Sequence, residues 1–195
     1  MIIRSLFITL LTCNQLFSTS HPFPKKQKSF ELINKSDTKP LYLFLKKDTK
    51  NIDTYRKIHD GNSLLHEAVS INSLKMVGIL ISNGIDPNMT NDDSNTPLHM
   101  AVTRGYTEIV QYLLEHGANP NIGNLYNDTP LHLAILSDQP EKIKVSIILE
   151  LLKHGTDLEH KNIYKTTPLQ QAIEAENCQY IIDILSNYKQ KSKCN

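Results

Sequence analysis

From about residue 62 onward, the apolar residues recur at the spacing of helices. One such stripe, spaced three and four positions apart, consists of Leu74, Val77, Leu80 and Ile81. Residues at this spacing lie on one face of a helix, which can then be buried. Segments 108–114 and 147–152 have similarly apolar character, and a shorter apolar run precedes each of them. The pattern predicts pairs of helices, a short one and a longer one, separated by polar loops.

A four-residue phrase repeats through this region in the same register. Its two full copies are Thr96, Pro97, Leu98, His99 and Thr129, Pro130, Leu131, His132. Looser copies begin at Ser63 and Thr167, so the spacings are 33, 33 and 38 residues. A second marker, formed by Gly84, Gly117 and Gly155, follows with spacings of 33 and 38. Two markers in one register indicate a repeated structural unit.

Each marker has a local physical reason. The Thr hydroxyl can cap the N-terminus of a helix, and Pro at the first helical position loses no hydrogen bond. Gly adopts the left-handed conformation that commonly ends a helix. Each unit is therefore expected to be a short helix, a turn, a longer helix and a glycine stop.

The period and the phrase Thr-Pro-Leu-His-x-Ala resemble the ankyrin repeat. The two full copies end in Ala101 and Ala134, and the segments 84–88 and 117–121 are also similar to that family. The resemblance implies an all-α repeat solenoid, an ankyrin-type stack of helix-turn-helix units with β-turn or extended loops between them. It further implies that the histidine of the phrase is structural and bonds to the neighbouring repeat.

The register divides the chain into units with the following bounds. They are a degenerate N-terminal capping repeat at 29–61, ankyrin repeats at 62–94, 95–127 and 128–165, a C-terminal capping repeat at 166–188 and a tail at 189–195. The third repeat carries an insertion at 137–145 between its helices, where Pro140 should break any helix. This insertion is either a recognition loop or a neutral surface insertion.

The N-terminal segment has the pattern of a secretory signal peptide. Residues 1–20 contain no acid, one base, an apolar run and small residues before His21. Residues 21–28 are a linker. We expect a secreted or periplasmic protein, for which membrane attachment is not expected once the signal peptide is removed. The alternatives are a cytoplasmic protein with an uncleaved N-terminus and one tethered to a membrane by its N-terminus, including lipidation at Cys13.

Composition and motifs argue against catalysis and nucleic-acid binding. The formal net charge is +1, which gives no overall attraction for nucleic acid. The sequence contains no zinc-protease, nucleophile-elbow or phosphate-loop motif and no Cys pair at metal spacing. We therefore expect no enzyme activity, metal, cofactor or small-molecule substrate. A disulfide between Cys178 and Cys194 is an open alternative to two free thiols.

The family resemblance places partner contacts at the loop tips and on the concave face. At the last two tips an aliphatic residue stands beside a tyrosine: Leu125, Tyr126, Ile163 and Tyr164. We expect these four to form a binding edge flanked by Arg104 and Leu136, because Tyr is frequent in interface cores. The alternative is that the four pack on one another. The predicted function is a non-enzymatic module that binds an as yet unidentified protein. The alternative is a structural, self-associating protein.

Overall fold

The computed structural model describes residues 60–175 and 179–192 of the 195-residue chain. Within these residues every regular element is an α-helix. The helices are α4 (Leu64–Ser70), α5 (Leu74–Ser82), α6 (Pro97–Thr103), α7 (Thr107–Glu115), α8 (Pro130–Leu136), α9 (Glu141–Lys153), α10 (Pro168–Glu174) and α11 (Gln179–Ser192). The predicted signal peptide, linker and nearly all of the capping repeat at 29–61 lie outside the described residues.

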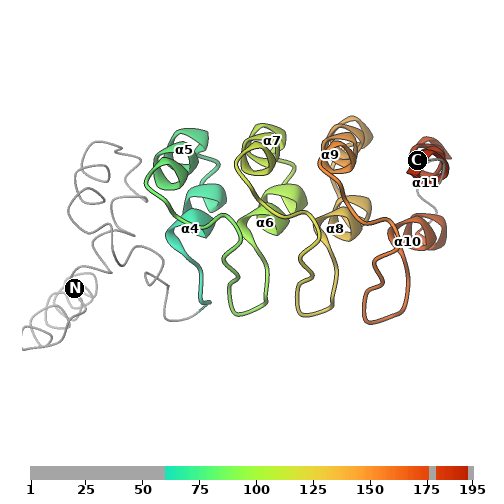
Figure 1. Cartoon of the computed structure of the whole chain (residues 1–195), viewed down its shortest axis with the longest axis horizontal. Coiled ribbons are helices and arrows are strands. Elements are labelled where there is room, and N and C mark those ends of the chain that lie inside the picture. The colour runs from blue at the N-terminus through green and yellow to red at the C-terminus, as the bar shows by residue number, and fades with distance from the viewer. Residues whose placement is uncertain (1–59, 176–178, 193–195) are drawn as a thin grey trace, which may run out of the picture.

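The helices form a row of antiparallel pairs, in which each short helix is followed by a longer one. Figure 1 shows α4, α6, α8 and α10 side by side, with α5, α7, α9 and α11 in a second layer and the connecting loops extending to one side. Each pair packs on the next pair along the row. The prediction of an all-α repeat solenoid is therefore confirmed.

The core runs along the row between the two layers. Leu98 and Leu131 are wholly buried at equivalent positions of α6 and α8, and the small residues Ala101 and Ala134 follow them on the same helix faces. The small residues let neighbouring short helices approach closely. Since the α6–α7 and α8–α9 pairs are covered by neighbours on both sides, burial depends on stacking as well as on the fold of each unit.

The repeated phrase begins each short helix through reciprocal hydrogen bonds. The amide of His99 donates to Thr96 Oγ1 at 3.4 Å, and the amide of Thr96 donates to His99 Nδ1 at 3.1 Å. Two backbone donors that the first helical turn leaves unpaired are satisfied in this way. Pro97 follows at the first helical position, where no amide proton is needed.

Glycine ends each of the longer helices α5, α7 and α9. The φ angles of Gly84, Gly117 and Gly155 are +87°, +89° and +78°. After α7, the amides of Gly117 and Ala118 donate to carbonyls of the last helical turn, to Leu114 and Leu113 respectively. A left-handed residue at this point lets the chain turn back while the helix carbonyls stay bonded.

The insertion in the third repeat is mostly helical, which corrects the expectation of a loop over 137–145. Helix α9 begins at Glu141 and contains 13 residues, so the insertion lengthens this helix at its N-terminus. Pro140 does not interrupt a helix but lies immediately before α9. Its carbonyl accepts from the amides of Ile143 and Lys144 at 2.8 and 3.0 Å. Proline is compatible with a helix start because the first amides lack intrahelical partners.

The last helix also extends beyond its predicted end. Helix α11 continues to Ser192, so most of the predicted tail at 189–195 is helical. Tyr188 fixes the added turns, because its hydroxyl donates to the carbonyl of Leu152 at 2.7 Å. Lys189 and Glu159 form an ion pair at 2.7 Å. Both contacts tie α11 to the preceding repeat.

Candidate functional site

Within the described residues, the loop tips at 91–94, 124–127 and 162–165 are four-residue turns, each held by an asparagine. In the middle turn, Asn124 Oδ1 accepts from the amides of Tyr126 at 2.9 Å and Asp128 at 3.0 Å. The amide of Asn127 closes the turn on the carbonyl of Asn124 at 2.8 Å. Asn91 and Asn162 hold the neighbouring turns through the same types of bond. Asparagine side chains that bond their own backbone stabilise such turns.

Backbone hydrogen bonds connect one turn to the next. The amide of Leu125 donates to the carbonyl of Asp93 at 3.1 Å, and the amide of Ile163 donates to that of Tyr126 at 3.0 Å. Asn162 Nδ2 adds a side-chain bond to Asp128 Oδ1 at 2.9 Å. The turns therefore have fixed positions relative to one another.

The two middle residues of each turn, here called the apical residues, point into solvent. In the last two turns they are the four predicted binding residues, with exposed fractions of 60% for Leu125, 56% for Tyr126, 52% for Ile163 and 70% for Tyr164. Side chains more than half exposed are not buried against each other, which disfavours the alternative of mutual packing. The earlier turn presents Asp92 and Asp93, both exposed.

Arg104 and Leu136 do not adjoin the apical residues. They lie at the C-terminal ends of α6 and α8, whereas the turns precede the N-termini of these helices. Seven helical residues correspond to about 10 Å. Arg104 also bonds to the preceding repeat, because its Nη1 donates to the carbonyl of Ser70 at 2.7 Å. The two residues therefore belong to the far end of the short-helix face.

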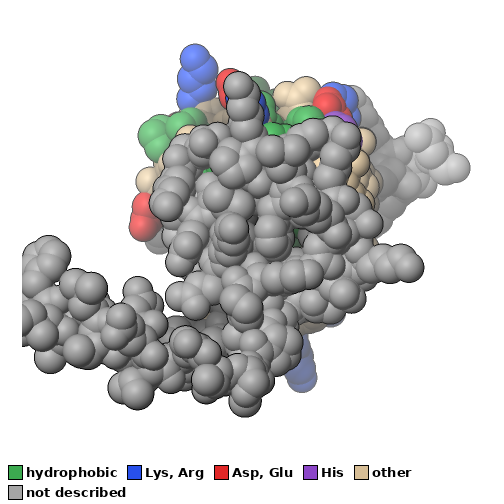
Figure 2. Space-filling view, turned by 90° about the vertical axis from the view of Figure 1, so that its left-hand side faces the viewer, with side chains coloured by type: hydrophobic (Ala, Val, Ile, Leu, Met, Phe, Trp, Pro, Cys, Tyr) green, Lys and Arg blue, Asp and Glu red, His purple; other side chains and the backbone are tan. Residues whose placement is uncertain are grey.

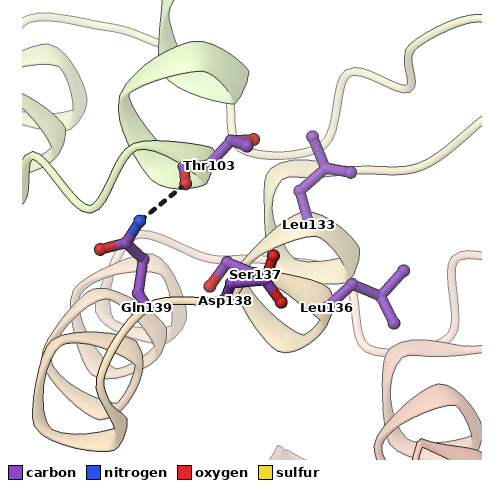
Figure 3. Close-up of a pocket in the computed structure, with 6 residues that line it drawn as sticks. All are labelled: Thr103, Leu133, Leu136, Ser137, Asp138 and Gln139. Atoms are coloured by element: carbon purple, nitrogen blue, oxygen red, sulfur yellow. Dashed lines mark hydrogen bonds between the residues drawn. The ribbon is translucent and has the colours of Figure 1, made fainter.

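A shallow depression of about 250 Å³ lies beside Leu136. Figure 3 shows its lining, which is Thr103 from α6, Leu133 and Leu136 from α8, and Ser137, Asp138 and Gln139 from the following segment. Gln139 Nε2 donates to the carbonyl of Thr103 at 3.3 Å across it. The sequence analysis missed Leu133 and Gln139. The repeat register could have indicated Leu133, because it aligns with the half-buried Met100.

The histidines of the repeated phrase join neighbouring repeats. His66 Nε2 lies 2.8 Å from the carbonyl of Asn95, and His99 Nε2 lies 3.0 Å from that of Asp128. His132 Nε2 makes the equivalent contact with Thr166 at 3.3 Å. Because Nδ1 accepts a backbone amide proton, Nε2 carries the proton and donates. Both ring nitrogens of each of these three histidines are therefore hydrogen-bonded within the protein.

Burial favours the neutral form of His99 and His132. Loss of solvation lowers the pKa of His99 from 6.5 to about 4, although the Asp128 carbonyl and carboxylate oppose the shift. Burial also lowers the pKa of His132. A neutral, buried imidazole with both nitrogens bonded is suited to packing two repeats together and is inaccessible to a substrate.

His116 and His154 stabilise the ends of the longer helices. Their Nδ1 atoms donate to the carbonyls of Tyr112 and Glu150, four residues earlier, at 2.8 and 3.0 Å. The His116 ring also stacks on Tyr112, with ring centroids 3.9 Å apart. The carbonyl of Tyr112 also accepts from the amide of His116 at 3.2 Å, so the histidine side chain adds a second bond at this helix end.

The charged residues form a mixed surface. The view in Figure 2, from the α4 end, shows basic, acidic and hydrophobic side chains close together among the described residues in sight. Within residues 60–175 and 179–192, no three His, Cys, Asp or Glu side chains gather as a group that could hold a metal ion. None of the helices in these ranges is long and apolar enough to cross a membrane.

Comparison with known families agrees with this architecture. A family model for ankyrin repeats in three copies matches residues 31–124 and 65–145, which together span more than half of the chain. A search of curated proteins gives no match. The family match, the repeated capping phrase and the stacked helix pairs lead to one conclusion, that this chain belongs to the ankyrin repeat family.

Proposed function

We propose that the protein is a non-enzymatic module that binds a partner protein through the apical residues of its last two turns. Ankyrin repeats generally act as protein-interaction modules, which sets the broad class. The observation that carries the finer proposal is the exposure of Leu125, Tyr126, Ile163 and Tyr164, each more than half exposed. Turn tips of soluble proteins are usually polar, and the preceding Asp92–Asp93 turn follows that rule.

The rigidity of the turns favours binding. The backbone bonds from Leu125 to Asp93 and from Ile163 to Tyr126 fix the backbone before a partner arrives. A partner therefore loses little affinity to ordering of these turns. Tyrosine has few rotatable bonds and combines an apolar ring with a polar hydroxyl, which suits it to an interface core.

The surface around the apical residues is suited to a partner protein whose interface has an apolar centre. The two apical pairs supply aliphatic and aromatic area, and the depression beside Leu136 offers a second, separate surface. Asp92 and Asp93 at the neighbouring turn would repel a phosphate backbone. We therefore expect a protein that places apolar side chains against the last two turns.

We also propose that the protein is exported, in line with the signal-like pattern of residues 1–20. Export would bring the binding edge to a partner outside the cytoplasm. N-terminal sequencing of the protein recovered from source cells would test this. A mature N-terminus at or near His21 supports export, whereas a retained Met1 in the cytoplasmic fraction contradicts it.

Affinity capture tests the binding edge. The full chain serves as bait in extracts of the source cells and in their culture medium, beside a Tyr126→Ser, Tyr164→Ser double variant. Leu149→Ser is the control, because Leu149 on α9 is an apolar side chain 47% exposed that belongs to none of the turns. The proposal expects a protein that the full chain and the control retain and the double variant loses. Equal capture by all three would place the site elsewhere, and no specific capture would contradict a binding role.

A further inference from the structure

Hydrogen bonds between successive turns form a ladder along the row of repeats. In each bond the first apical residue of one turn donates its amide proton to the carbonyl that is aligned with the second apical position of the preceding repeat. The three bonds are Asp92 to Asp60 at 3.1 Å, Leu125 to Asp93 at 3.1 Å and Ile163 to Tyr126 at 3.0 Å. Each turn therefore offers the next one a carbonyl at the same place.

The described part of the ladder ends at the carbonyl of Tyr164. This carbonyl has the register position of the Tyr126 carbonyl, and no described residue donates to it. Figure 1 shows the turn before α10 as the last connecting loop in the row. It closes like the other turns, because the amide of Lys165 donates to the carbonyl of Asn162 at 2.9 Å. The Tyr164 carbonyl therefore faces away from the preceding turn, beyond the end of the row.

Apolar side chains lie beside this acceptor. Ile163 and Tyr164 are both more than half exposed, and Tyr164, at 70%, is the most exposed large hydrophobic residue among those described. When an extended chain adds to the edge of a hydrogen-bonded array, main-chain bonds supply affinity and side-chain contacts supply specificity. The last turn has both parts, an acceptor at a fixed position and an apolar surface next to it.

Two lysines give the last turn a charge that the earlier turns lack. Lys161 and Lys165 flank it, are both exposed and form no ion pair with a described residue. The aligned residues of the two earlier turns are all uncharged: Thr90, Gly123, Ser94 and Asn127. Residues 161–166 contain no acid, whereas residues 90–95 contain two acids and no base. The last turn is therefore suited to a segment that carries a carboxylate.

A second copy of this chain does not meet that requirement. To continue the row, it would have to place its own N-terminal end against the last turn. Residues 21–50, which precede the first described repeat, contain eight lysines and three acids, so their net charge has the same sign as that of the last turn. Like charges at short range oppose association. The charge of the turn therefore favours a segment of a different protein.

We propose that the last turn, residues 161–166, binds an extended segment of a partner protein in which an apolar residue stands next to an acidic one. A backbone amide of the segment donates to the carbonyl of Tyr164 as the next bond of the ladder. The apolar side chain lies on Ile163 and Tyr164, and the carboxylate pairs with Lys161 or Lys165. This inference rests on the proposed binding role of the apical residues and specifies what they recognise.

Selection of short random peptides on the full chain tests the charge of the segment. Enriched peptides should contain an apolar residue next to Asp or Glu. The double variant Lys161→Thr, Lys165→Asn, which copies Thr90 and Asn127 of the earlier turns, should bind them about three- to tenfold more weakly at low salt. The difference should decrease at high salt. Lys142→Thr is the control, because Lys142 is exposed on α9 and belongs to no turn.

Two measurements test the backbone bond. Among analogues of an enriched peptide that are N-methylated at one position each, one should bind at least about tenfold more weakly, because methylation removes the amide donor. The carbonyl ¹³C resonance of Tyr164 should shift when the unmethylated peptide is added. The resonance of the Asp93 carbonyl should not shift, because it already accepts from Leu125. Circular-dichroism melts check that the lysine variants remain folded.

The outcomes separate this inference from the proposed function. A failure to enrich any peptide would overturn the inference, as would binding that is insensitive to N-methylation or to the lysine replacements. If affinity capture still retained a protein through Tyr126 and Tyr164, the proposed function would stand, with recognition by side chains alone. Self-association of the full chain that the double lysine variant abolishes would also overturn the inference, because the occupant would then be a second copy.

Discussion

His99 provides the sharpest test of how the repeats are held together. Replacement of His99 by Asn places an amide oxygen where Nδ1 now accepts from Thr96, but removes the Nε2–H that donates to the carbonyl of Asp128. The capping bond within the repeat is kept and the bond between repeats is lost. The variant therefore isolates the contribution of one contact between neighbouring repeats.

The size of the destabilisation follows from the hydrogen bonds that remain in the variant. The Asp128 carbonyl still accepts from the amide of Asn124 at 3.0 Å, so it is not left unsatisfied. The net loss is one hydrogen bond, about 1 kcal/mol, together with about 1–2 kcal/mol for ring packing at a residue that is 1% exposed. We expect the free energy of unfolding to fall by about 2–3 kcal/mol at pH 7.

The difference should also depend on pH. Burial lowers the pKa of His99 from 6.5 to about 4 in the folded protein, so between these values the unfolded chain binds the proton and the folded protein does not. Wild-type stability therefore falls as pH decreases from 6.5 toward 4, by about 3 kcal/mol from this group. The Asn variant does not lose stability in this way. The difference in free energy of unfolding between wild type and variant should therefore shrink and vanish near pH 4.

Urea unfolding followed by circular dichroism, at several pH values, measures both effects. His116→Asn is the control, because His116 is exposed and its bond to Tyr112 is local; its cost should stay below about 0.5 kcal/mol. A deficit for His99→Asn under 1 kcal/mol at pH 7, or one that stays constant down to pH 4, would refute the reasoning.

Three further tests, which use five substitutions, address separate parts of the structure. Gly117→Ala should destabilise by about 1–2 kcal/mol in urea unfolding although the added methyl group meets no atom, because φ is +89°; an unchanged midpoint would contradict this. Gly105→Ala should cost more, since its methyl group would also meet Gln139, and adding Gln139→Ala should recover part of the loss in a double-mutant cycle. Tyr126→Ser with Tyr164→Ser should leave the thermal melt within about 2 °C of wild type, because both side chains are exposed; a larger fall would show that they are structural.

Much of the fold followed from the sequence because its signals are local. Thr96 and Pro97 determine where a helix begins through bonds within four residues, and Gly117 determines where one ends through its own φ angle. Pro140 is also a local signal, but a proline can either interrupt a helix or stand at the start of one. The sequence alone could not show which role it had, so the length of α9 was misjudged.

The candidate site was predictable only in part. The register placed Leu125 and Tyr126 at a turn, and the structure adds that their side chains face solvent; their role in binding stays a prediction. Leu136 was wrongly placed beside them, because its distance from the turn depends on the direction of a whole helix. Ile173 on α10 is 54% exposed, which was missed, since the register gives the residue type at each position and not whether a neighbour covers it.

The structure of the turns determines which residues such a protein can substitute without loss of stability. Their fixed geometry uses backbone groups and the side chains of residues outside the apex, as in the bonds of Asn124 to the amides of Tyr126 and Asp128 and of Asn162 to Asp128. The side chains of Leu125 and Tyr126 take no part in it. New residue pairs could therefore be exchanged at each apex, one turn at a time, without loss of folding. The scaffold thus allows its binding preference to diverge by substitutions that leave stability nearly neutral.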